Sequence, residues 1–249
     1  SIVIVIFSSC NSTPENLLVI PKQTEVVLAV NISSLVVKSG IGSGDIGSEL
    51  FNQSKKEMRR HNKEMARLLT DLKKSPMSTG INYFTDIFVF YYNESYDEQF
   101  TCTSIELNDS EKFGSFIDDF FDANDSDYEF EEEDDYQCIF LNDLCVAWDE
   151  DKAVLIFAAD YNDRSNLDYV VEDIFSLGED DDITNNEHFS KFYENHTDVG
   201  LWVNSDVILS LSDHEISQFE DDTGYEIDEF ADSHMAVFLT FEDGQINLK

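Results

Sequence analysis

The chain alternates between short stretches with the two-residue periodicity of strands and stretches with helical periodicity. The strand-like stretches are rich in β-branched and aromatic residues and end at Gly, Pro, Asn or Asp clusters. We predict strands at 25–31, 85–92, 100–107, 136–141, 144–149, 153–158 and 234–241. Asn142-Asp143 and Glu150-Asp151-Lys152 are turn-forming clusters of hairpin length, so the three strands around them are expected to form an antiparallel meander.

Helical spacing is clearest at 110–123, where five apolar residues follow an Asn108/Asp109 cap. From 45 to 74, apolar residues recur every seven positions, which predicts one long helix or two helices in line with a narrow apolar seam. Two shorter helices are expected around 167–174 and 189–193. Because single helices interrupt runs of strands without regular alternation, the fold class is α+β, an antiparallel sheet meander with inserted helices.

One internal repeat suggests a domain organisation. Residues 24–31 and 197–204 match at Thr, Val, Leu, Val and Asn, and each segment leads into a short apolar stretch, at 35–37 and 207–211. We interpret the match as a tandem duplication, with a first α+β repeat at 21–195 and a truncated second copy at 196–249. The alternative is chance similarity between two alternating strands.

The N-terminus resembles an export signal. An apolar run at 1–7 precedes Ser8-Ser9-Cys10, which looks like a bacterial lipobox. We therefore predict a signal remnant at 1–9, a diacylated Cys10, and a lipidated tether at 10–20. The alternative is a buried first strand that ends in a free thiol. The prediction places the protein in the bacterial cell envelope, at the outer membrane, with the membrane as a partner through the lipid anchor.

Three short motifs carry a family resemblance. They are Ile20-Pro21-Lys22 before a strand, Ser34-Leu35 in a short helix, and Thr79-Gly80-Ile81-Asn82 entering another strand. Together with the lipobox they resemble the Bacteroidota lipoproteins of domain-of-unknown-function family 4836, over most of the chain. The resemblance implies an envelope location and an α+β fold; members are longer than this chain, which fits a truncated second repeat. It implies no particular activity.

Charge excludes some partners and makes one segment unusual. With 53 acidic and 15 basic residues, the formal net charge of −38 opposes binding to nucleic acid and to a surface of anionic lipid headgroups. Eight basic residues against three acidic ones give 55–74 a net charge of +5, and the rest of the chain −43. We expect this helix to pack across the body with its basic face near acidic loops such as 129–135 or 179–182. The alternative is a solvated basic face.

Few residues point to chemistry. Gly42 to Gly47 formally satisfies G-x-G-x-x-G, but it follows a helical stretch instead of leaving a strand, so we interpret it as a loop. The five histidines are scattered: His61 lies in the basic helical segment, and the other four lie near ends of elements, where solvated imidazoles are ordinary. The sequence therefore predicts a protein that is not an enzyme and that needs no cofactor.

One acidic loop is a candidate calcium site. Asp122, Asn124, Ser126 and Glu133 supply oxygen ligands at positions one, three, five and twelve of an EF-hand-like loop. Asp127 stands where the sharp turn requires glycine, so a solvated acidic loop is the alternative.

Three cysteines remain after Cys10. Cys138 and Cys145 would lie diagonally on one face of the predicted hairpin, too offset for a relaxed disulfide, so buried free thiols are expected. A bridge that involves Cys102 is the alternative in an oxidising compartment.

These features together favour a lipid-anchored binding or structural module with a protein or glycan partner. An envelope hydrolase is one alternative. Another is a lipoprotein that captures carbohydrate or peptide, which an exposed aromatic platform formed by Trp148, Trp202 or the tyrosines would favour.

Overall fold

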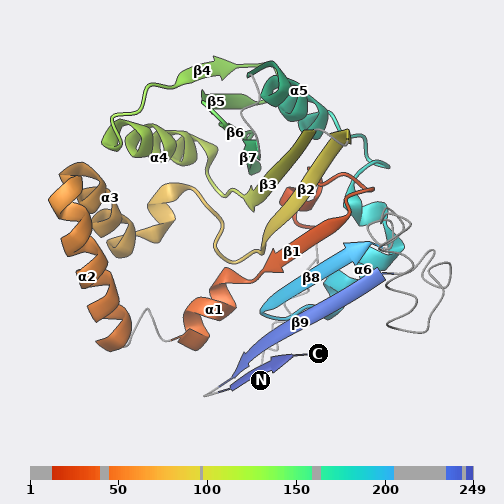
Figure 1. Cartoon of the computed structure of the whole chain (residues 1–249), viewed down its shortest axis with the longest axis horizontal. Coiled ribbons are helices and arrows are strands. Elements are labelled where there is room, and N and C mark those ends of the chain that lie inside the picture. Colours follow the sequence, from red (N-terminus) through yellow and green to blue (C-terminus); the bar gives the residue numbers. More distant parts are fainter. Residues whose placement is uncertain are drawn as a thin grey trace, which may run out of the picture.

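The computed structural model describes residues 13–39, 45–95, 98–158, 164–204, 234–242 and 245–248. Within these ranges, ten strands form one antiparallel sheet in the order β10-β9-β8-β1-β2-β3-β7-β6-β5-β4, which curves into a C (Figure 1). The strands are β1 (Val26–Val30), β2 (Ile87–Ser95), β3 (Glu98–Glu106), β4 (Glu129–Glu132), β5 (Gln137–Leu141), β6 (Leu144–Trp148), β7 (Lys152–Ala158), β8 (Val199–Asn204), β9 (His234–Glu242) and β10 (Gln245–Leu248).

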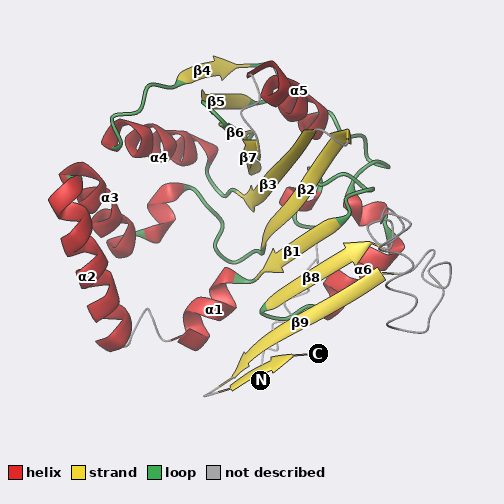
Figure 2. Ribbon diagram, viewed as in Figure 1, coloured by secondary structure: helices red, strands yellow, loops and turns green. Residues whose placement is uncertain are grey.

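The helices are inserted singly or in pairs between these strands (Figure 2). They are α1 (Ile32–Ser39), α2 (Asp45–His61), α3 (Lys63–Lys74), α4 (Ser110–Ala123), α5 (Arg164–Phe175) and α6 (Glu187–Asn195), with 3₁₀ turns η1 (Glu15–Leu17), η2 (Pro76–Thr79) and η3 (Ile183–Asn185). The predicted α+β class with an antiparallel sheet is confirmed. None of these helices, within the residues that the structure describes, is long and apolar enough to cross a membrane.

Local chemistry explains why α4 occupies the predicted residues. The Asp109 carboxylate accepts a hydrogen bond of 3.0 Å from the Lys112 amide and caps the helix. Phe113, Ile117 and Phe121 then recur at helical spacing and are buried on one side. Strand β4, by contrast, was not predicted, because three of its four residues are glutamates; it is an edge strand, where charged residues are tolerated.

The basic segment forms a helical hairpin, so the prediction of one helix or two in line is wrong. The chain reverses at Asn62, whose side chain accepts from the Met65 amide at 2.9 Å and donates to the carbonyl of Ala123. Lys73, near the end of α3, lies 4.2 Å from the centre of the Phe51 ring near the start of α2. The hairpin packs on α4 and η2, away from the acidic loops to which we had assigned its basic face.

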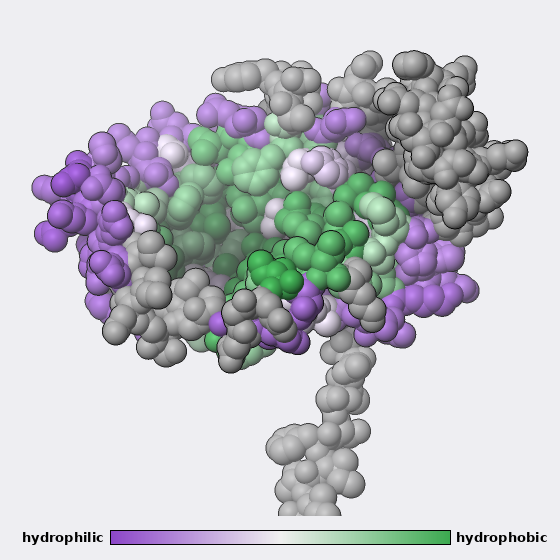
Figure 3. Space-filling view, turned by 60° about the horizontal axis from the view of Figure 1, so that its bottom comes forward, coloured by the Kyte–Doolittle hydropathy of each residue, from purple (hydrophilic) through white to green (hydrophobic). Residues whose placement is uncertain are grey.

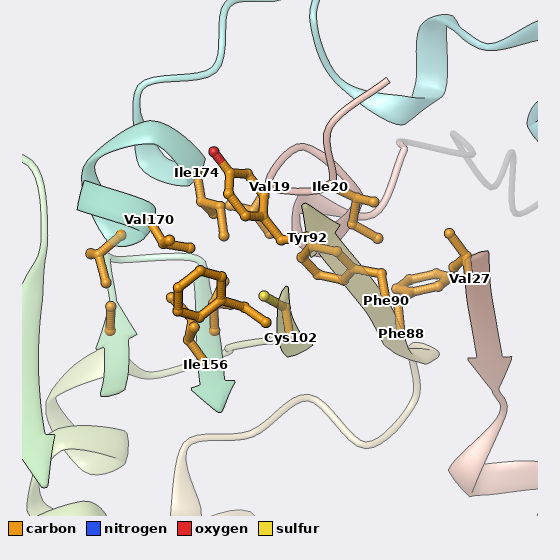
Figure 4. Packing of buried hydrophobic residues seen from close by; sticks show 14 of the residues in the cluster. Val19, Ile20, Val27, Phe88, Phe90, Tyr92, Cys102, Ile156, Val170 and Ile174 are labelled. Atoms are coloured by element: carbon orange, nitrogen blue, oxygen red, sulfur yellow. The ribbon is translucent and has the colours of Figure 1, made fainter. Parts of the chain in front are cut away.

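The sheet has two faces, which we call the core face and the open face. The core face is covered by η1, α5, η3 and α6 and holds the larger buried cluster. Figure 4 shows Phe88, Phe90 and Tyr92 of β2 packed among residues of the segment after η1, of α5 and of neighbouring strands. On the open face, α4 covers β5 to β7 through Phe113 and Ile117.

The two similar segments pair with each other at the middle of the sheet. Leu28 of β1 lies opposite its sequence equivalent, Leu201 of β8. The amide of Asn31 donates to the carbonyl of Asp198 at 2.9 Å, and the amide of Asn204 donates to the carbonyl of Glu25 at 2.7 Å. These two hydrogen bonds join equivalent positions in opposite directions, so the pairing has approximate two-fold symmetry. The duplication stays an interpretation of this symmetry, and the predicted helix at 207–211 lies outside the described residues.

Gly80 is a position where only glycine fits. Its φ of +75° is unfavourable for side-chain-bearing residues, and an added Cβ would lie 2.1 Å from the carbonyl oxygen of Asp109. We expect Gly80→Ala to lower the free energy of unfolding by about 3 kcal/mol, because both strain and overlap must be relieved. Urea denaturation measures the loss. Gly178→Ala is the control, because a Cβ added there would lie 3.1 Å from the Asp181 side chain and near no other group. It should lower the free energy of unfolding by less than about 0.5 kcal/mol. Equal effects would contradict this account.

Candidate binding surface

The residues predicted to bind calcium do not gather in one depression. Asp122 lines a cleft between α3 and α4, whereas Glu133 lines two other depressions at the β4–β5 end of the sheet. Strand β4 separates them, because it carries the chain from the end of α4 along the sheet edge. The side-chain amide of Asn124 donates to the carbonyl of Phe120 at 2.9 Å, so Asn124 caps the C-terminal end of α4. Within the described ranges, no three His, Cys, Asp or Glu side chains are placed to hold a metal ion.

The three cysteines that follow Cys10 are buried free thiols. Cys102 and Cys145 both lie opposite Ile156, and Cys138 is diagonal to Cys145, as the hairpin register predicted. Burial raises the pKa of Cys138 to about 12 and raises those of the other two thiols as well. These thiols therefore stay protonated and unreactive at neutral pH. Cys10 itself lies outside the described residues.

The aromatic platform that would favour carbohydrate capture is not formed by the tryptophans. Trp148 and Trp202 are 3% and 0% exposed. Trp148 packs edge-on against Phe113, and Trp202 packs edge-on against Phe189, so both rings belong to the cores.

The open face of the central strands is apolar across the sheet. Leu28 lies between Val89 of β2 and Leu201 of β8, and Leu201 lies beside Val237 of β9. The other half-buried apolar residues of this face are Val26, Val30, Ile87, Ile105, Leu155, Val199, Val203, Leu239 and Phe241. Tyr91, Phe157 and Met235 extend it and are 47%, 42% and 49% exposed.

On the part of this face formed by β1, β2, β3, β7 and β8, the polar side chains are Thr101 and Thr103 in the centre and Asn93 and Gln99 towards the end of the β2–β3 pair. An antiparallel sheet with one solvated face normally alternates apolar and polar residues. Here the main helical contacts of the central strands are on the core face: η1 packs against β2, β3 and β7, and α6 packs against β8. Among the residues that the structure describes, the open face is therefore apolar without equivalent cover.

Figure 3 shows the result as a hollow with a hydrophobic floor and hydrophilic residues along its left edge. The hydrophilic residues at its left edge belong to the α2–α3 hairpin, which lies on the same side in Figure 1, because the turn between the two views is about a horizontal axis. A contiguous apolar surface of this kind on a folded protein usually marks a binding site. The sequence signal was present in Val26-Val-Leu-Ala-Val30, where apolar residues fill both faces of one strand.

Helix α1 is fixed at the end of this face by a buried carboxylate. Asp198, 2% exposed, accepts from the Lys38 ammonium at 2.6 Å, the Ser34 hydroxyl at 2.5 Å and the Phe241 amide at 2.6 Å. Burial alone would raise the pKa of Asp198, but these donors hold it below its usual range. The carboxylate thus ties α1 to β8 and β9, and α1 exposes Val36 and Val37.

A cleft of about 590 Å³ separates α3 from α4. Its apolar residues are Leu68, Leu72 and Phe116, and the charged residues around it are mainly acidic. This mixture offers no convergent set of groups for a reaction, and the cleft is secondary to the open face.

The family model for "Domain of unknown function (DUF4836)" matches residues 15–249. The chain belongs to this family. The resemblance seen in the sequence is thereby confirmed at the level of the family, and Gly80 of its Thr-Gly-Ile-Asn motif has the physical role described above.

Solved structures similar to this DUF4836 chain include crystal forms I and III of TP0453. They have TM-scores of 0.47 and 0.46 and sequence identities of 9% and 10%; the alignments cover 95% and 93% of this chain and 77% and 76% of theirs. Likeness at this level carries no functional information. No curated protein matches the sequence significantly.

A buried polar cluster on the core face of the DUF4836 fold was missed in the sequence. Tyr193 donates to the Asp86 carboxylate at 3.0 Å, and Nε2 of His196 lies 3.1 Å from the same oxygen. Asn16 donates to the main-chain carbonyl of Asp86 at 2.8 Å. The expectation of a solvated imidazole is wrong for His196, whose side chain is 9% exposed. Tertiary packing decides this, because Asp86 is more than a hundred residues away.

The cluster joins η1 and α6 to the start of β2, and it makes stability depend on pH. Burial lowers the pKa of His196, but Asp86, the Tyr193 carbonyl and Asp198 together raise it above its usual value. Protonated His196 therefore stabilises the fold fully below its unfolded pKa of about 6.5, and that contribution is lost as pH rises through the higher folded value.

We expect the stability difference between the natural protein and His196→Gln to shrink as pH rises from about 6 to about 8. Urea denaturation at several pH values measures it, and both proteins retain His188 and His234, so the difference isolates His196. His61→Gln, at an exposed position of α2, is the control for the loss of an imidazole from the surface. A difference that grows with pH would show that Asp86 does not favour the imidazolium.

Proposed function

We propose that this protein is a lipid-anchored binding module of the bacterial cell envelope and that its ligand, which is apolar, binds on the open face. The observation that supports this proposal best is the half-exposed apolar face of the central strands, with its hollow in Figure 3. Removing apolar surface from water is favourable by roughly 25 cal/mol per Å². A ligand that covers this face would supply the burial that the fold itself does not.

The chemistry of the face favours a hydrocarbon chain over a sugar or a peptide. Sugars and peptides need several positioned hydrogen-bond partners, whereas the polar side chains within the central part of this face are Thr101 and Thr103. The cross-strand neighbours Leu28, Val89, Leu201 and Val237 form a continuous row from β2 to β9. An elongated apolar group such as an acyl chain matches such a row.

The proposed location rests on Cys10. The cysteine follows two small residues and an apolar run, and the same segment, 10–20, contains η1, which packs on the core face of the sheet. Stable anchoring needs two acyl chains, which a diacylated Cys10 would supply. The protein would then be held at a membrane, which is a source of acyl chains.

Cys10→Ala should release the protein from envelope membranes, since lipidation at this residue is proposed as the anchor. Fractionation into soluble and membrane pools, followed by immunoblotting, measures the distribution. The matched control is Ser9→Ala, which keeps a small residue before the cysteine and should leave the protein in the membrane pool. A Cys10→Ala protein that stays in the membrane pool would eliminate lipidation as the anchor.

The open face is tested with the neutral fluorescent probe Nile red and a pair of same-sized substitutions. Val89 and Thr103 lie opposite each other on this face. Val89→Thr should weaken probe binding about threefold to tenfold, because it adds a hydroxyl to the contact, and Thr103→Val should strengthen it by a similar factor. Titration of fluorescence gives both dissociation constants.

Tyr169→Ser is the control for exposed aromatic surface elsewhere. Tyr169 is 48% exposed on α5, which packs on the core face, and its loss should leave the dissociation constant unchanged. If Tyr169→Ser weakens binding and the Val89 and Thr103 variants do not, the open face is not the binding surface.

A further inference from the structure

The α2–α3 hairpin is a basic element beside an apolar hollow in a strongly acidic protein. Residues 55–74 carry +5 and the rest of the chain −43. In Figure 3 the hairpin forms the left edge of the hollow. Positive charge at the edge of an apolar surface is complementary to a ligand that is apolar along its length and negatively charged at one end.

The acidic residues within 55–74 do not neutralise this part of the hairpin. Each of these three pairs with a basic residue three positions later on its own helix, Glu57 with Arg60, Glu64 with Arg67 and Asp71 with Lys74. Five basic residues lie outside these three pairs, and among them Lys56, Arg59 and Lys63 are exposed. The local positive charge is therefore presented to solvent.

Packing does not explain these basic residues. The buried residues described for the hairpin are Met65 and Ala66, and its contacts with the body are to α4 and η2. Lys56, Arg59 and Lys63 could be replaced by any polar residue without loss of a core contact. Their charge is thus available for an anion.

We propose that the ligand of the open face is a single-chain anionic amphiphile, a long-chain carboxylate, whose hydrocarbon chain lies on the open face and whose carboxylate is held by the α2–α3 hairpin. This inference rests on the proposed function and adds the charge of the ligand and the element that recognises it. Lysine and arginine donate charge-assisted hydrogen bonds to carboxylates, which are stronger than those between neutral groups.

A monomeric amphiphile fits better than a membrane surface. A bilayer would place many anionic headgroups against the whole footprint, where the body carries −43. A single carboxylate at the hairpin interacts mainly with nearby charges, because the Debye length is about 8 Å at physiological ionic strength. The hollow of Figure 3, with the α2–α3 hairpin at its left edge, also suits one chain better than a flat surface.

The experiment compares the affinities of three ligands that have the same twelve-carbon chain and different head groups. Each ligand displaces Nile red that is bound to the full chain. The ligands are dodecanoate, dodecanol and dodecyltrimethylammonium, below their micellar concentrations. Dodecanoate should bind about tenfold tighter than dodecanol, and the cation more weakly than either. Raising the salt concentration should reduce the preference for dodecanoate.

A charge variant separates the head from the tail. In Lys56→Gln/Arg59→Gln/Lys63→Gln, the affinity for dodecanoate should fall to the affinity for dodecanol. Dodecanol and Nile red should bind to this variant as they bind to the natural protein. Glu57→Gln/Glu64→Gln makes the same hairpin more basic and should strengthen dodecanoate binding. Lys191→Gln, at an exposed position of α6 beside the core face, is the control and should change nothing.

The outcomes distinguish the two proposals. Equal affinities for dodecanoate and dodecanol, or a triple variant that binds dodecanoate normally, overturn the anionic inference and leave the apolar binding function standing. Failure of Nile red and of all three amphiphiles to bind overturns the function itself. Hairpin-dependent binding to phosphatidylglycerol vesicles without binding of monomeric dodecanoate would replace the monomer with a membrane surface.

Discussion

The antiparallel pairing of β1 with β8 joins residues 169 to 177 positions apart, and the remaining architecture depends on it. Each strand has its own further neighbour, β2 beside β1 and β9 beside β8, so this one ladder joins the two parts of a single sheet. The ladder continues beyond the strand ends through the Asn31 and Asn204 amides. Because strand pairing fixes the register, it also fixes which side chains share a face.

The register gives the sheet two apolar faces with different cover. On the core face, η1, α5, η3 and α6 bury the aromatic residues of β2 and β8, including Phe88, Phe90 and Trp202. On the open face, α4 covers β5 to β7, and the central strands keep half-buried valines and leucines. The first face holds the larger buried cluster, and the second is the surface on which the proposed ligand would bind.

Charged and polar groups connect these layers at few points. Asp198 ties α1 to β8 and β9, and the Asp86, Tyr193 and His196 cluster ties α6 to the start of β2. Both carboxylates are buried and both have partners, as a buried charge requires. The large acidic surplus lies on the surface, where it opposes association with anionic surfaces and leaves the basic hairpin as a local exception.

The sequence by itself determined the elements whose signal is local. Helix α4 begins and ends at the predicted residues because Asp109 caps it and its phenylalanines recur at helical spacing. The β5-β6-β7 meander followed from short turn clusters, and the buried state of Cys138 and Cys145 followed from its register. Family membership also followed from short motifs, one of which contains Gly80.

Only the tertiary structure decided the features that depend on distant partners. The seven-residue apolar spacing of 45–74 suits a straight helix as well as a hairpin, and the contact of Asn62 with Ala123 accompanies the reversal. His196 looks like a solvated residue at a helix end until Asp86 is placed beside it. The apolar residues on both sides of β1 were visible in the sequence, but periodicity cannot say which side the helices cover. That depends on where the chain returns after each strand, so the open face emerged only from the assembled fold.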